Sequence, residues 1–161
     1  MSSSSSSGSR DLNGRVIAQG RLARLRSRLR GAPQASPLSL TDDVVTVAGS
    51  DDDAVASSAA LDASSWRSEE EVILRHDLEL PPGRLDDAVA VAALDGYEVI
   101  SDGRWGPAPA ASAAGYAVVV VARVQRLDAM HLSQERSRMA SLGSRHDGVA
   151  RSWAVLQRPR G

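Results

Sequence analysis

Residues 116–157 restrict the fold of this chain more than any other part of the sequence. They begin with an apolar run, 116–124, in which valine and alanine fill both alternating sets of positions, as in a strand covered on both faces. Residues 128–145 then show helical periodicity, and an Asp-Gly pair at 147–148 provides a turn into a short last strand at 153–157. The pattern predicts the second half of a small α+β domain.

The first half of the domain begins with residues 71–80, which alternate between apolar and polar side chains. Alternation with a period of two predicts a strand with one buried face, and His76 lies on that face. The Pro-Pro-Gly sequence at 81–83 ends the strand and opens a helix, which Gly96 closes as a left-handed cap. Residues 97–101 predict a second short strand.

The resulting order, β-α-β-β-α-β, is that of the ferredoxin-like fold, a four-stranded antiparallel sheet with both helices on one face. We expect this domain to cover residues 70–158, with the first and third strands in the middle of the sheet. Their outward side chains would share the uncovered face, unless the N-terminal segment covers it. The side chains expected there are Ile73, Arg75, Asp77, Val119, Val121, Arg123 and Gln125.

Residues 1–69 contain few large apolar side chains and begin with a serine tract, so we expect a largely disordered N-terminal extension. Within it, residues 12–30 carry leucines at helical spacing among arginines, which predicts a short basic amphipathic helix. Such a helix either stays solvated or contacts an anionic membrane surface or RNA. Residues 31–68 are expected to form a linker, although a valine-rich run at 44–47 could form one strand.

The composition excludes several classes of protein. Cysteine is absent, which removes disulfides, thiolate metal sites and cysteine nucleophiles, and suits a reducing compartment. The formal net charge of -1 argues against a protein that coats nucleic acid. The chain begins without the charged and apolar regions of a signal peptide, and its longest apolar run is far shorter than the roughly 20 residues of a spanning helix. We therefore expect a cytoplasmic protein.

Catalytic and cofactor chemistry find little support in the sequence. His131 and Glu135 lie one turn apart on the predicted second helix, but no second histidine on that helix has metal-ligand spacing. Ser133 and Ser141 have no candidate base partner. Stacking of RNA bases is disfavoured, because no aromatic side chain is expected to face outward from the two central strands. We predict no metal, no cofactor and no enzymatic activity, with a small enzyme of unknown reaction as the third choice.

These mixed-charge surfaces are better suited to contact with another protein than to RNA stacking or catalysis. We predict that a partner meets the sheet face and the outer side of the second helix, or that the sheet face forms a homodimer. The predicted contact residues are Arg75, Asp77, Arg123 and Gln125 on the sheet and Arg136, Arg138 and Arg145 on the helix. The alternative is a dimeric small-ligand sensor, which would bind a metabolite beside Trp105 and the loop at 102–115.

The end of the predicted domain resembles a known family. The segment Glu-Arg-Ser-Arg-Met-Ala-Ser-Leu at 135–142, followed by Arg-His-Asp-Gly at 145–148 and by Trp153, resembles the RraB family of bacterial ribonuclease E regulators. The segment Gly-Tyr-Glu-Val at 96–99 also looks like that family's entry into its second strand. The resemblance spans about residues 70–158, and its motif positions are Gly96, Tyr97, Glu135, Gly148 and Trp153.

This resemblance implies a ferredoxin-like fold and a regulatory role without chemistry. Regulators of this kind associate with the ribonuclease and inhibit it, so the implied partner is a ribonuclease E-type enzyme. Gly148 and Trp153 match the family pattern at the right separation, whereas Asp147, Arg151 and Ser152 depart from it. From the residues alone, Gly148 is expected to cap the second helix and Trp153 to fill the core.

Overall fold

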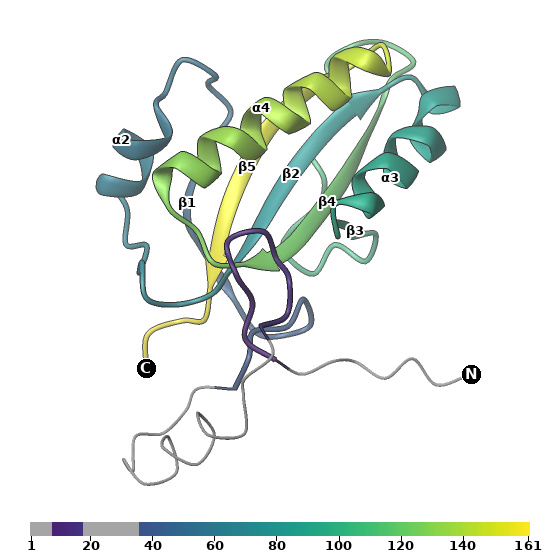
Figure 1. Ribbon diagram of the computed structural model, residues 1–161. Helices are drawn as coiled ribbons and strands as arrows, with labels where there is room; N and C mark the ends of the chain where they lie inside the picture. Colours follow the sequence, from purple (N-terminus) through teal and green to yellow (C-terminus); the bar gives the residue numbers. More distant parts are fainter. Residues whose placement is uncertain (1–7, 18–35) are drawn as a thin grey trace, which may run out of the picture.

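The computed structural model describes residues 8–17 and 36–161, and this part of the chain has an α+β fold (Figure 1). In it, five strands form one antiparallel sheet in the order β1-β5-β2-β4-β3. Helices α2, α3 and α4 pack on the same face of that sheet. The elements are β1 Val45–Ser50, α2 Ser57–Asp62, β2 Val72–Leu80, a 3-10 turn Pro82–Arg84, α3 Leu85–Leu94, β3 Glu98–Val99, β4 Ala117–Gln125, α4 Ala129–Arg145 and β5 Val149–Gln157.

The predicted first and third strands are confirmed as neighbours, β2 and β4. Their antiparallel register runs from Val72 opposite Gln125 to Leu80 opposite Ala117. The predicted second helix is confirmed as α4, whose N-cap Asp128 accepts a hydrogen bond from a backbone N–H in the first turn. Gly96 has a φ of 81°, which confirms it as the left-handed residue after α3.

The sheet has five strands where four were expected, because residues 45–50 add β1 beside β5. The expectation of a linker at 31–68 is therefore wrong for the part that forms β1 and α2. Gly49 and the aspartates that follow it are turn signals, and they predicted that any strand here would be too short to join a sheet. Instead, Ala48 is buried in the core with Val155 of the neighbouring strand, and this long-range pairing outweighs the local turn signals.

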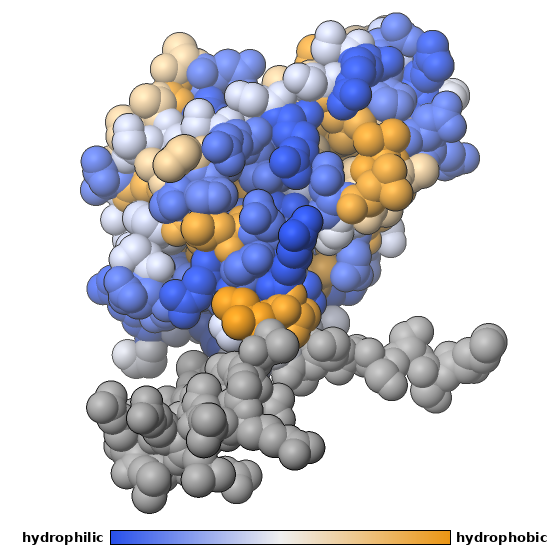
Figure 2. Space-filling model, in the orientation of Figure 1, coloured by the Kyte–Doolittle hydropathy of each residue, from blue (hydrophilic) through white to orange (hydrophobic). Residues whose placement is uncertain are grey.

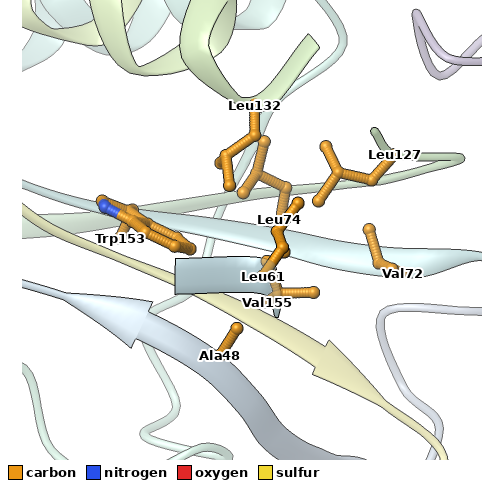
Figure 3. Close-up of a cluster of buried hydrophobic side chains, with 8 residues drawn as sticks. All are labelled: Ala48, Leu61, Val72, Leu74, Leu127, Leu132, Trp153 and Val155. Atoms are coloured by element: carbon orange, nitrogen blue, oxygen red, sulfur yellow. The ribbon is translucent and has the colours of Figure 1, made fainter. Parts of the chain in front are cut away.

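A hydrophobic cluster joins these added elements to the rest of the domain (Figure 3). Its members are Ala48, Leu61, Val72, Leu74, Leu127, Leu132, Trp153 and Val155. Trp153 is confirmed as a core residue. Helix α2 has only six residues, too few for a stable isolated helix, so the packing of Leu61 in this cluster holds it in place.

The other face of the sheet is covered by irregular segments, so the expectation of an uncovered face is wrong. Residues 38–44 and 100–105 pack on it in a third cluster. Its buried members are Leu38, Ile73, Ala122, Val124 and Leu156, with Leu40, Val44, Ile100, Trp105 and Ala154 against them. The alternative of cover by the N-terminal segment thus holds for residues 38–44.

Strand β4 presents the opposite set of side chains from the one predicted. Val119, Val121, Arg123 and Gln125 lie opposite β2 residues that face the helices, so they belong to the helix-covered face. The residues between them face the other way. Because small apolar side chains occupy both sets, the hydrophobic pattern did not distinguish the two faces, and a shift of one residue exchanges them.

The turn after α4 also differs from the prediction in its details. Asp147, not Gly148, takes the left-handed conformation, with a φ of 61°. Gly148 is needed for another reason, since a Cβ atom there would collide with the carbonyl oxygen of Glu79. Strand β5 begins directly after this turn and is longer than the predicted strand at 153–157.

Within residues 8–17 and 36–161, no helix has both the length and the apolar character needed to cross a membrane. The predicted basic helix at 12–30 lies mostly outside the described residues. Its described part, residues 12–17, contains a turn, and Val16 pairs with Arg10 in an isolated bridge.

Candidate functional site

Arg123 and Gln125, two of the predicted contact residues, are buried between the sheet and the helices, with exposed fractions of 3% and 0%. The Arg123 guanidinium donates to Gln125 Oε1 from Nε at 2.9 Å and from Nη2 at 2.6 Å, and to the carbonyl oxygen of Asp95 from Nη1 at 2.6 Å. Its Nη2 also lies 3.3 Å from a carboxylate oxygen of Glu135. Neither side chain can meet a partner at the surface.

The motif residues Tyr97 and Glu135 complete this buried cluster. The Tyr97 hydroxyl donates to Glu135 Oε2 at 2.7 Å, and the Arg123 guanidinium lies 4.7 Å from the centre of the Tyr97 ring. His76 packs edge-on against the same ring, with 5.8 Å between ring centres. Tyr97 and Glu135 therefore meet inside the molecule, where their contacts with Arg123 connect α4 and the end of α3 to the sheet.

Burial sets the protonation states in this cluster. It lowers the pKa of His76 to about 3, and the positive charges of Arg123 and Arg136 act in the same direction. Burial, with a contribution from the Glu135 carboxylate, raises the pKa of Tyr97 well above its ordinary value. Both groups are therefore neutral near pH 7.

Residues 8–17 close one end of this cluster. The side chain of Gln125 donates to the carbonyl oxygen of Leu12 at 3.1 Å, and the backbone N–H of Arg126 donates to that of Asp11 at 3.0 Å. Glu71 accepts from the backbone N–H groups of Arg10 and Leu38, one with each carboxylate oxygen. Part of the extension predicted to be disordered is thus bonded to the domain.

Arg75 and Asp77 lie on the loop-covered face and pair with each other at 2.9 Å. Asp77 also accepts from the hydroxyl of Ser152 at 2.6 Å, and Arg75 Nη1 donates to the carbonyl oxygen of Trp105 at 3.1 Å. These two residues hold a loop on the sheet, and do not form the open recognition surface that was predicted.

The three arginines predicted on α4 have separate surroundings. Arg136 donates to the carbonyl oxygen of Val55 at 2.6 Å and lies over the Trp153 ring, so it attaches the segment before α2. Arg138 is partly exposed, 3.4 Å from Glu135 and from Asp95. Arg145 is exposed near the end of α4. They do not combine into one contact surface.

A groove of about 500 Å³ lies beside β4 on the loop-covered face. It is lined by residues 118–120 of β4, by residues 99–103 from the end of β3 onwards, by residues 105–108 and by Arg75. Apart from Arg75 and Asp102, its side chains are small or apolar, and Trp105 is the largest. We call this feature the Trp105 groove.

The edge of β4 is open at this groove. β3 pairs with β4 only at Ala122 and Val121, and the backbone N–H of Ile100 then donates to Val120 at 2.9 Å. In an antiparallel ladder, each residue directs its N–H and C=O to one neighbouring strand, and the side alternates along the chain. Val118 therefore directs both groups to the same edge of β4 as Val120, away from β2. β3 does not extend that far, and an unpaired strand edge can pair with another extended chain.

The remaining titratable candidates each have a separate local partner. The His131 ring nitrogen Nδ1 lies 2.8 Å from the carboxylate of Asp128, the N-cap of α4. His146 Nδ1 lies 2.8 Å from the carbonyl oxygen of Leu142. Glu135 is used by Tyr97 and Arg123, so the predicted His131–Glu135 neighbours do not act together. No group of three or more His, Asp or Glu side chains within residues 8–17 and 36–161 could hold a metal ion.

Comparison with known proteins gives no match to a protein-family model, to a curated protein or to a solved structure. The geometry of the chain itself must therefore carry the functional argument. Sequence reasoning singled out Trp105 and its loop only for the sensor alternative, and missed Val118 and Glu79. The short second strand was the available signal, because it cannot cover the whole edge of a much longer neighbour.

Proposed function

We propose that this protein is a non-enzymatic binding domain that takes an extended segment of a protein partner along the open edge of β4. The observation that carries the proposal is the length of β3, two residues beside the nine of β4. An added strand would pair with the backbone groups of Val118, and such pairing supplies affinity in many peptide-binding domains. Its side chains would enter the Trp105 groove.

Apolar walls on both sides of this edge support a partner segment with apolar side chains. Trp105 and Ile100 lie on one side, and α3, which contacts β4, lies on the other. After the exposed Asp86 and Asp87 of its first turn, helix α3 is apolar even where it faces solvent, with Leu94 85% exposed. Figure 2 shows hydrophobic side chains gathered over part of this helix. An amphipathic surface helix would instead present a polar face.

The RraB-like sequence features supply a specific partner for the proposal. Strands β5, β2, β4 and β3 with α3 and α4 are compatible with a ferredoxin-like unit to which β1 has been added. In a regulator of that kind the partner is a ribonuclease E-type enzyme, and the domain inhibits it by binding. The lack of cysteine supports a reducing, cytoplasmic setting for this encounter.

The test uses the full chain, a displayed library of random peptides and a purified ribonuclease E-type enzyme. Val118→Pro removes one edge N–H without removing a β2–β4 hydrogen bond, while Val118→Ala keeps that N–H and serves as the matched control. We expect Val118→Pro to lower the affinity for the selected peptides by about tenfold, and Val118→Ala to change that affinity little. A folded Val118→Pro variant with unchanged affinity for the peptides and the enzyme would contradict the proposal.

A small-ligand sensor is the second candidate, favoured by the volume of the groove. About 500 Å³ lies within the usual range of small-molecule sites, roughly 300–1,000 Å³, and Arg75 provides a positive group at its wall. A ligand that binds only the folded state raises the melting temperature. A thermal-shift screen of metabolites would support this candidate if a metabolite stabilises the wild type and leaves Trp105→Ala unchanged. No stabilisation across the panel favours the protein partner.

A further inference from the structure

We propose that Glu79 is the positioning residue of the Trp105 groove, because its carboxylate fixes the loop at 101–115 that forms one wall. The consequence for binding rests on the proposed function, whereas the positioning of the loop can be tested without any ligand. Glu79 belongs to β2, on the loop-covered face, and is only 2% exposed.

Both oxygens of the Glu79 carboxylate are used by one short part of the loop. Oε1 accepts from the backbone N–H of Ser112 at 3.0 Å and of Ala113 at 2.7 Å. The Ser112 hydroxyl lies 3.1 Å from each carboxylate oxygen. Hydrogen bonds to an ionised acceptor are stronger than neutral ones, so a single carboxylate can hold this stretch.

Arg151 completes the attachment from the opposite side. Its Nη1 donates to Glu79 Oε2 at 2.9 Å and to the carbonyl oxygen of Ala110 at 2.8 Å. Arg151 occupies an irregularity in the β2–β5 register, where Asp77 lies opposite Ser152 but Leu78 lies opposite Ala150. This extra residue directs the arginine to the acid, a common use of a β-bulge.

The middle of the loop has few other contacts to hold it in place. Residues 107–114 are proline, alanine and serine only, so they offer little apolar area to bury. Gly103, Gly106 and Gly115 have positive φ angles of 66°, 91° and 79°, which makes the turns of the loop possible but adds no contact. The start of the loop has contacts of its own, because Trp105 packs against the third cluster and Arg104 donates to the carbonyl oxygen of Leu40. Glu79 and Arg151 therefore carry the attachment of residues 110–113.

The experiment places fluorotryptophan at the three tryptophans and follows their fluorine NMR signals in full-length protein. Glu79→Gln keeps the shape of the side chain but replaces one acceptor oxygen with a donor. We expect it to shift or broaden the Trp105 signal and to leave those of Trp66 and Trp153 in place. Glu69→Gln, at an exposed position, is the matched control and should move none of them.

Two milder variants keep the inference testable if Glu79→Gln does not fold. Arg151→Met removes the charged partner, and Ser112→Ala removes only the hydroxyl while keeping both backbone N–H groups. The expected order of effect on the Trp105 signal is Arg151→Met above Ser112→Ala. An unchanged Trp105 signal, with unchanged hydrogen exchange at Ser112 and Ala113 in the folded variants, overturns the inference.

Peptide affinity then separates this inference from the function on which it rests. A Glu79→Gln variant that alters the Trp105 signal and weakens a selected peptide by about tenfold supports both. If the signal changes but the wild type selects no peptide, the positioning role stands and the proposed function fails. If the wild type binds and Glu79→Gln changes neither the signal nor the affinity, the function stands and the positioning role is overturned.

Discussion

The two faces of the sheet bury charged side chains in different ways. On the helix-covered face, Arg123 pairs with Glu135 and Gln125, which lie on a helix and a strand with backbone hydrogen bonds of their own. On the loop-covered face, Glu79 binds the backbone of an irregular loop. The first arrangement connects elements that are already ordered, whereas the second determines where a loop lies. The helix-covered face therefore maintains the fold, and the loop-covered face shapes the groove.

The largest expected effect is at Arg123. Arg123→Met leaves the buried Glu135 carboxylate with only the partly exposed Arg138, 3.4 Å away, as a charged partner. The loss of the buried pair should lower the free energy of unfolding by about 3–5 kcal/mol. Urea denaturation followed by circular dichroism measures the change. The comparison predicts that the folded variant keeps the Trp105 signal of the wild type. A loss below about 1 kcal/mol would show that this pair contributes no more than an exposed one.

The second prediction concerns the pH dependence of stability that arises from His76 on the helix-covered face. Burial lowers the pKa of His76 from 6.5 to about 3, so between these values the unfolded chain binds a proton that the folded chain does not. Stability should therefore fall as the pH drops from about 6.5 towards 3, with a slope of up to about 1.4 kcal/mol per pH unit from this residue. Denaturation of wild type and His76→Phe between pH 7 and pH 4 tests it. If the free energy of unfolding of the wild type falls with pH no more steeply than that of His76→Phe, the burial argument is contradicted.

The loop-covered face should respond at lower pH. Hydrogen bonds from the backbone of Ala113 and Ser112 lower the pKa of Glu79 from 4.5 to about 2. A carboxyl group whose pKa is lowered by folding stabilises the folded state at pH values above its pKa in the unfolded chain. This contribution is lost as the pH falls from about 4.5 towards 2. Protection of the Ser112 and Ala113 amides, taken relative to the intrinsic exchange rate at each pH, should fall in this window for the wild type. Glu79→Gln should show low protection there at every pH, and protection equal to that of the wild type would count against the attachment.

The smallest effect is expected at an exposed ion pair outside both faces. Arg84 and Asp147 lie 2.9 Å apart with side chains 50% and 61% exposed. Arg84→Ala should change the free energy of unfolding by only about 0–1 kcal/mol, because water screens the pair. The same urea titration measures it beside Arg123→Met. Equal losses in the two variants would remove the distinction between buried and exposed charge on which the comparison depends.

Prediction from the sequence succeeded where one local signal dominated. The alternation at residues 72–80, the glycine at 96 and the N-cap aspartate at 128 each specify a local structure, and β2, the end of α3 and the start of α4 follow them. It failed for β1, because an edge strand depends on a neighbour far along the chain. It also failed for the faces of β4, where residues 118–122 are apolar on both faces and the polar Arg123 and Gln125 lie on the buried, helix-covered one.

The candidate site was the least predictable part. Arg123 and Gln125 were expected at the surface, since charged and amide side chains usually lie there, yet mutual hydrogen bonds allow their burial. The open edge at Val118 depends on where β3 ends, and local sequence marks such boundaries poorly. Glu79 gave no signal of its role, because its hydrogen-bond partners in the loop are backbone N–H groups.

The sequence by itself determined the α+β class, the neighbouring strands β2 and β4 and the long helix α4, because hydrophobic periodicity and cap residues act over a few neighbouring positions. Only the tertiary structure decided that β1 extends the sheet, which side chains of β4 face the helices, and how the loop at 101–115 lies beside the open edge. These features depend on contacts between distant parts of the chain, and their energies come from burial and charge pairing that no local pattern records.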